Sequence, residues 1–160
     1  MDKKLVVGIA DMKIAREEGM LITYALGSCL GICLYDPLIR LAALVHVMLP
    51  LNMEASRRSP LKYADTGIRE TLRQMEGQGA MRSRIVTKMA GGARMFDVPG
   101  SGNLGNIGQR NIESAHLVLR REGVRLLRED VGGTTARTLL FDTQTGQACV
   151  RSYGKPELIF

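Results

Sequence analysis

The sequence predicts an α+β fold, a layered sandwich of stacked, mixed β-sheets flanked by helices. About eight short apolar runs have strand character, whereas only two segments repeat apolar residues at helical spacing. A doubly wound α/β sheet would alternate strands and helices along the chain, and this sequence does not. The length of 160 residues fits one domain, which we expect to span residues 1–160.

Four strands are predicted in the first third of the chain, where apolar runs are bounded by turn residues. Asp36 and Pro37 separate the third run from the fourth. The predicted strands are 5–9, 21–26, 30–35 and 41–48.

Two helices are predicted in the middle of the chain. A polar loop over 52–62 leads into the first helix, 60–76, where Pro60 suits the first helical position. The second helix is predicted over 108–121, and Gly123 lies just beyond it as a cap.

The remaining apolar runs predict strands at 85–90 and 124–130 and a C-terminal hairpin of 138–142 with 147–153. The glycine-rich segment 97–108 is interpreted as a loop. It has neither the Lys-Ser/Thr of a P-loop nor the compact glycine spacing of a dinucleotide-binding turn.

Composition argues against several classes of protein. Lys and Arg number 22 against 16 Asp and Glu, a net charge of +6, but there is no Trp and the three Phe and four Tyr are scattered. Nucleic acid is therefore not the expected partner. The longest apolar stretch, 41–51, is too short to cross a membrane, and no signal peptide is recognised. We expect a cytoplasmic protein with reduced thiols and no membrane insertion.

Cys29 is the first candidate for chemistry. It follows Gly27 and Ser28 on a turn between two apolar runs. Such turns expose a nucleophile and supply backbone N–H groups to an oxyanion. The alternative is a small buried hydrophobe, which is how Cys33 and Cys149 are interpreted. The cysteine and histidine spacing matches no zinc pattern, so no metal is expected.

His46 is the second candidate. It shares a strand face with Leu44 and Met48, where an imidazole needs a hydrogen bond or a function. A thiol nucleophile needs a base, and His is the usual one. A hydrogen-bonded core histidine is the alternative. His116, beside the apolar face of the second helix, is interpreted as a structural or surface residue.

Six segments, in order along nearly the whole chain, together resemble the chemoreceptor glutamine deamidase family, CheD of bacterial chemotaxis. They are LGSC at 26–29, HVMLP at 46–50, KYAD at 62–65, AGGARMF at 90–96, NIGQRN at 106–111 and EDVGG at 129–133. The chain departs from the family at Val131, where Thr is common, and in the loop 97–103. Neither departure touches the Cys and His positions.

The resemblance implies that Cys29 and His46 are catalytic and that Thr23 is the third member of the site. From the residues alone, Thr23 is a strand threonine explained by β propensity. In the functional interpretation its hydroxyl orients the imidazole. The resemblance also implies a fold like that of the cytotoxic necrotizing factor toxins, and a reaction that needs no cofactor.

The implied activity is hydrolysis of glutamine side chains to glutamate on bacterial chemoreceptors, whose acidic cytoplasmic helices suit a basic enzyme. Three alternatives stay open. The protein binds the chemotaxis phosphatase CheC as a regulatory module; it is a cysteine peptidase or a transglutaminase-like acyl transferase; or Cys29 and His46 are buried and inert.

Overall fold

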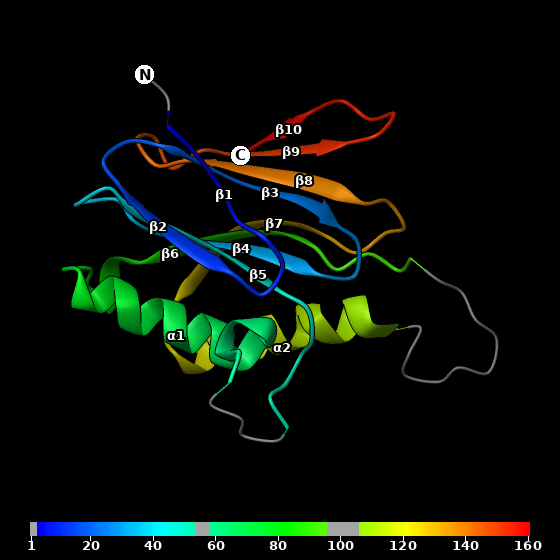
Figure 1. Ribbon diagram of the computed structural model, residues 1–160, viewed down its shortest axis with the longest axis horizontal. Coiled ribbons are helices and arrows are strands. Elements are labelled where there is room, and N and C mark those ends of the chain that lie inside the picture. The colour runs from blue at the N-terminus through cyan, green and yellow to red at the C-terminus, as the bar shows by residue number, and fades with distance from the viewer. Residues whose placement is uncertain (1–2, 54–57, 96–105) are drawn as a thin grey trace.

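The computed structural model describes residues 3–53, 58–95 and 106–160, which form two five-stranded sheets and two α-helices (Figure 1). The first sheet has the strand order β1 (Lys4–Val6), β3 (Met20–Leu26), β8 (Arg137–Asp142), β9 (Ala148–Ser152) and β10 (Leu158–Ile159). The second has the order β2 (Met12–Arg16), β5 (Leu41–Val47), β4 (Leu30–Asp36), β6 (Val86–Gly91) and β7 (Arg125–Val131). Both sheets are mixed, because β1 pairs with β3 and β6 with β7 in parallel.

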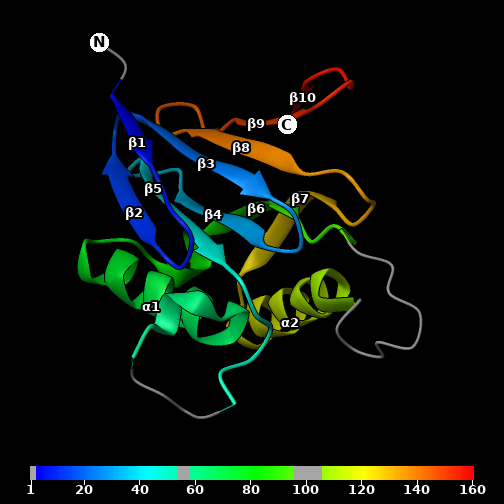
Figure 2. The same ribbon diagram turned by 45° about the vertical axis from the view of Figure 1, so that its right-hand side comes forward.

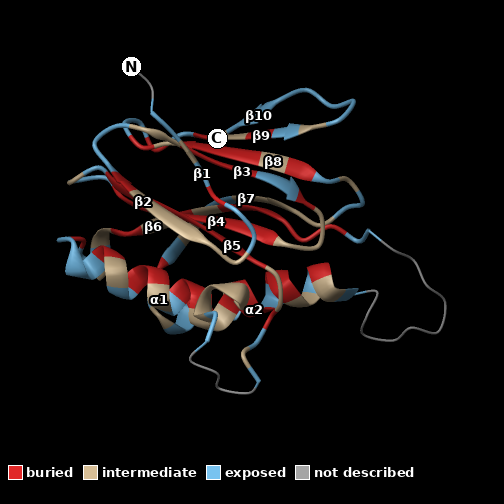
Figure 3. Cartoon of the chain, viewed as in Figure 1, coloured by how far each residue is buried: buried red, intermediate tan, exposed pale blue. Residues whose placement is uncertain are grey.

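The molecule has three layers. Helices α1 (Ala64–Gly77) and α2 (Ile107–Arg121) cover the outer face of the second sheet, and the first sheet covers its other face (Figures 1 and 2). The second sheet is therefore the middle layer, and β4 and β5 are buried along their whole length (Figure 3). Strands covered on both faces are expected to be continuous apolar runs, as these two are.

Alternation along β5 divides its side chains between two cores. Leu41, Ala43, Val45 and Val47 pack toward the helices. Ala42 and Leu44 pack between the two sheets, and His46 has the same parity. The side chain of His46 therefore faces the layer between the sheets.

The predicted α+β layered class is confirmed, and each of the eight predicted strands has a counterpart. Two strands were not predicted. Strand β2 is a sheet edge with charged residues, Lys13 and Arg16, interrupting its apolar pattern, and β10 has only two residues.

The predicted start of the first helix is wrong. Pro60 begins a short 3₁₀ helix, Pro60–Lys62, and α1 begins only at Ala64 because Tyr63 is extended. A second 3₁₀ helix, Arg82–Arg84, precedes β6. The loop 97–103, and all but the last three residues of the predicted loop 97–108, lie outside the described residues. Within the described parts of the chain, no helix is long and apolar enough to span a membrane.

Candidate active site

Cys29 lies on the connection by which the chain leaves the first sheet at β3 and enters the second at β4 (Figure 1). We call residues 27–29 the cysteine turn. Just before it the pairing of β3 with β8 is interrupted, and Ala25 adopts a left-handed conformation with φ +57°. The Gly27 N–H donates to the Ala25 carbonyl oxygen at 3.0 Å. The thiol therefore sits at a sharp change of chain direction, as the sequence predicted.

Backbone groups at the end of β6 hold the cysteine turn from one side. The Ala93 N–H donates to the Gly27 carbonyl oxygen at 2.8 Å, and the Gly92 N–H donates to that of Cys29 at 2.9 Å. Gly91 has φ +116°, and a Cβ atom there would lie 2.2 Å from the Cys29 carbonyl oxygen. Only glycine allows this approach, which gives the Gly-Gly pair a positional role beyond ending a strand.

His46 bonds across the layer between the sheets to Thr23. The Nδ1 atom of His46, on β5, lies 2.7 Å from Oγ1 of Thr23, on β3. Thr23 Oγ1 also lies 2.7 Å from the Val7 carbonyl oxygen, which can only accept, so the hydroxyl proton goes there. His46 Nδ1–H must then donate to Thr23. The unprotonated nitrogen of the neutral ring is therefore Nε2.

Nε2 of His46 is a buried acceptor without a hydrogen-bond partner among the described residues. Cys29 comes directly before β4 and two positions before Gly31, the register partner of His46, so continued alternation places it on the same face of the sheet as His46. Cys29 is partly buried against the core between the sheets. The structure shows no hydrogen bond between Cys29 Sγ and the His46 ring, but both side chains face the layer between the two sheets.

Burial keeps both groups neutral at rest. It raises the pKa of the Cys29 thiol, an effect that the cysteine's own backbone N–H opposes less strongly. Burial also lowers the pKa of His46. At rest, Cys29 is therefore a neutral thiol and His46 a neutral imidazole.

Gly31 makes room for the Thr23–His46 pair, and sequence reasoning missed it. A Cβ atom on Gly31 would lie 3.2 Å from Thr23 Cγ2, 3.1 Å from Leu26 Cδ1 and 2.9 Å from Leu139 Cδ2. The first sheet thus packs directly against the bare backbone opposite His46. A glycine within an apolar strand was the available signal.

Two buried polar side chains also support the site. The side-chain amide of Asn111, on α2, donates to the carbonyl oxygens of Ser28 and Met48 at 2.9 and 3.0 Å. Arg137, on β8, donates to the carbonyl oxygen of Gly91 at 2.9 Å. Asn111 falls in a segment that carried the family resemblance, whereas nothing in the sequence singled out Arg137.

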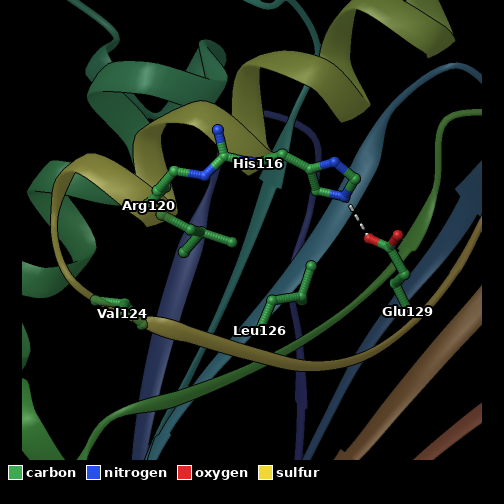
Figure 4. A pocket seen from close by; sticks show the side chains of 6 residues that line it. His116, Arg120, Val124, Leu126 and Glu129 are labelled. Carbon is green, nitrogen blue, oxygen red and sulfur yellow. Dashed lines mark hydrogen bonds and ion pairs between the residues drawn. The ribbon is translucent and has the colours of Figure 1, made fainter.

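The other candidates lie apart from this site. Cys33 is fully buried, and Cys149 is only partly so on β9. His116 Nε2 lies 2.6 Å from Glu129 Oε2 at a pocket between α2 and β7 (Figure 4). Val131 ends β7 and packs against the core under the helices. No cluster of three or more potential metal ligands occurs in the described parts of the chain.

The class that these features define is an α+β sandwich with a cysteine on an inter-sheet turn and a buried, oriented histidine facing the same layer between the sheets. Residues 48–152 match the family described as CheD chemotactic sensory transduction, and the chain belongs to this family.

Its relatives match over almost their whole length. A probable chemoreceptor glutamine deamidase CheD of Syntrophomonas wolfei is 44% identical, with 99% of each chain covered. One of Symbiobacterium thermophilum is also 44% identical over 98% of this chain and 97% of the relative. One of Caldanaerobacter subterraneus is 42% identical over 96% of both.

Proposed function

We propose that this protein hydrolyses the side-chain carboxamide of specific glutamines on bacterial chemoreceptors, producing glutamate and ammonia. The observation that carries the proposal is the Thr23–His46 hydrogen bond, which leaves Nε2 unprotonated in the layer that Cys29 also borders. The printed names of the relatives, chemoreceptor glutamine deamidases, support the choice of substrate.

The acylation half of the reaction uses three side chains. Nε2 of His46 takes the thiol proton as Cys29 Sγ bonds to the carboxamide carbon, giving a tetrahedral oxyanion. Oγ1 of Thr23 accepts the hydrogen bond from His46 Nδ1–H throughout, which keeps the ring in one tautomer and orientation. The carbon–nitrogen bond then breaks, the imidazolium returns its proton to the leaving nitrogen, and ammonia departs from a thioester.

Deacylation repeats these roles with water. His46 takes a proton from water as its oxygen attacks the thioester carbon, and the carbon–sulfur bond breaks. The imidazolium returns this proton to the departing sulfur, which restores the thiol, and the side chain leaves as a carboxylic acid that ionises to the carboxylate. This sequence requires no metal or cofactor. Binding of the phosphatase CheC stays a prediction from the family resemblance.

The function is tested by mass analysis of purified receptor cytoplasmic fragments after incubation with the protein. Replacing NH₂ by OH raises the mass of a glutamine by about one unit, and each glutamine is followed separately. We expect a small set of receptor glutamines to react, while an unrelated coiled coil with exposed glutamines does not. Failure to convert any receptor glutamine, or conversion at the same rate by Cys29→Ala, would refute the proposal.

A further inference from the structure

The cysteine turn is held by its carbonyl groups, and the middle one has a side-chain partner. The carbonyl oxygens of Gly27 and Cys29 accept from backbone N–H groups, whereas that of Ser28 accepts from Nδ2 of Asn111. Nδ2 also donates to the carbonyl oxygen of Met48, just past the end of β5. Asn111 thus ties the cysteine turn to the strand that carries His46.

The orientation of the Asn111 amide is determined by its partners. Carbonyl oxygens only accept hydrogen bonds, so the NH₂ group must face both of them. Oδ1 is then left buried, with no partner among the described residues. An unpaired buried acceptor costs about 1–3 kcal/mol. Asparagine occupies this fully buried position although Oδ1 has no partner among the described residues, which points to a role for its two donors.

The hydrogen bond to Ser28 also controls the next N–H group. The Ser28 carbonyl and the Cys29 N–H belong to one planar peptide, and this bond, like every bond between described residues, is trans, so the two groups point in opposite directions. Fixing the oxygen on the α2 side turns the N–H away from α2. A donor on the carbonyl also polarises the peptide and strengthens its N–H.

The Cys29 N–H is not committed to a backbone acceptor among the described residues. It lies close enough to its own sulfur to lower the pKa of the thiol, although burial has the larger, opposite effect. An N–H beside the attacking sulfur is suited to bind the oxyanion formed by that attack.

We propose that Asn111 is a positioning residue that aims and strengthens the Cys29 N–H as the oxyanion donor. The inference rests on the proposed acyl chemistry of Cys29, but not on the receptor as substrate. The close approach of α2 supports it. A Cβ atom on Gly108 would lie 2.5 Å from the carbonyl oxygens of Gly92 and Ala93, so the first turn of α2 packs directly on the segment that holds the cysteine turn.

Ser114 provides a matched control on the same helix. Its Oγ donates to the Pro50 carbonyl oxygen at 2.6 Å, and it is buried like Asn111. It therefore anchors the segment after β5 to α2 without reaching the cysteine turn. Losing the Ser114–Pro50 hydrogen bond therefore tests the packing of α2, while the hydrogen bond from Asn111 to the Ser28 carbonyl stays in place.

The experiment compares two reactions of Cys29 in a Cys149→Ser background. Acylation by 4-nitrophenyl acetate passes through an oxyanion, whereas alkylation by iodoacetamide does not; each is located at Cys29 by mass. We expect Asn111→Ala to lower the ratio of acylation to alkylation rates by about tenfold to a hundredfold, less than for a deleted donor because the N–H remains. Asn111→Asp keeps the shape of the side chain but loses both donors when ionised. It should show the same fall in the ratio, and it replaces Asn111→Ala if that variant does not fold.

Ser114→Ala should leave the ratio within about twofold of the parent value, because its bond does not touch the oxyanion donor. An unchanged ratio in the Asn111 variants, or an equal fall in Ser114→Ala, would overturn the inference. The ratio needs no receptor. A parent protein that deamidates no receptor glutamine would therefore refute the proposed function without affecting this result.

Discussion

His46 is a buried imidazole whose two nitrogens have different surroundings. Nδ1 is fixed by Thr23, which is itself fixed by the Val7 carbonyl, and Nε2 has no partner among the described residues. A histidine kept only for packing would be expected to satisfy both nitrogens, since an unpaired buried polar atom is costly. This asymmetry is the residue-scale argument that His46 is a base.

Replacing Thr23 by Val keeps the branched shape and removes the acceptor for Nδ1–H. The unpaired N–H costs about 1–3 kcal/mol, so kcat/KM for deamidation should fall about 5-fold to 150-fold. Thr23→Ser keeps the hydroxyl and should retain most of the activity. Equal activity in the Val and Ser variants would show that the hydroxyl does not orient the ring.

The pH profile tests the neutral resting pair. Because burial lowers the pKa of His46 below its ordinary value, Nε2 stays unprotonated to a lower pH than in a free imidazole, and the acid limb of kcat/KM should lie below the ordinary histidine range. Because burial raises the pKa of the Cys29 thiol above its ordinary value, thiolate absorbance should be absent at neutral pH and appear only in alkali. Thiolate present at neutral pH and lost in His46→Ala would show a resting ion pair instead.

At the scale of elements, the site depends on how closely the first sheet packs on β4. Gly31 pairs with His46, and the methyl group of Thr23 occupies the space next to its bare backbone. The two strands that carry Thr23 and His46 belong to different sheets. The spacing between the sheets therefore sets the length of the Thr23–His46 bond.

Gly31→Ala should separate these strands. Its methyl group would overpack the core, at a cost of about 1–3 kcal/mol in unfolding free energy, and would displace Thr23 from His46. The free energy of unfolding, measured with urea, and kcat/KM for deamidation should both fall.

Gly77→Ala is the control for Gly31→Ala, because a Cβ atom there meets nothing within 4 Å and φ is not positive. It should leave activity unchanged and stability equal or slightly higher. Full activity in Gly31→Ala would contradict the role given to the close packing.

How far the sequence predicts this site depends on the kind of contact. Apolar runs predict β4 and β5, the turn predicts the position of Cys29, and alternation predicts the face of His46. The pairing of Thr23 with His46 joins two sheets, which no local pattern contains, and only the family resemblance pointed to it. The role of Arg137 and the space needed at Gly31 depend on tertiary approach in the same way.

At the scale of the whole molecule, a net charge of +6 would steer the protein toward an acidic partner, such as the receptor helices that the family resemblance implies. Salt screens such steering. We expect kcat/KM on receptor fragments to fall about threefold or more between about 50 and 500 mM salt, with kcat nearly constant. Alkylation of Cys29 by neutral iodoacetamide serves as the control and should not change. A flat salt profile would show that the charge has another use.

The most direct test of the account is whether deamidation requires the Cys29 thiol itself. In a Cys149→Ser background, Cys29 is alkylated by iodoacetamide to increasing extents, and its occupancy is measured by mass beside the remaining deamidation of receptor fragments. The account predicts that activity falls in direct proportion to occupancy and disappears when Cys29 is fully modified, while the protein stays folded. Activity that persists in fully modified, folded protein would contradict it.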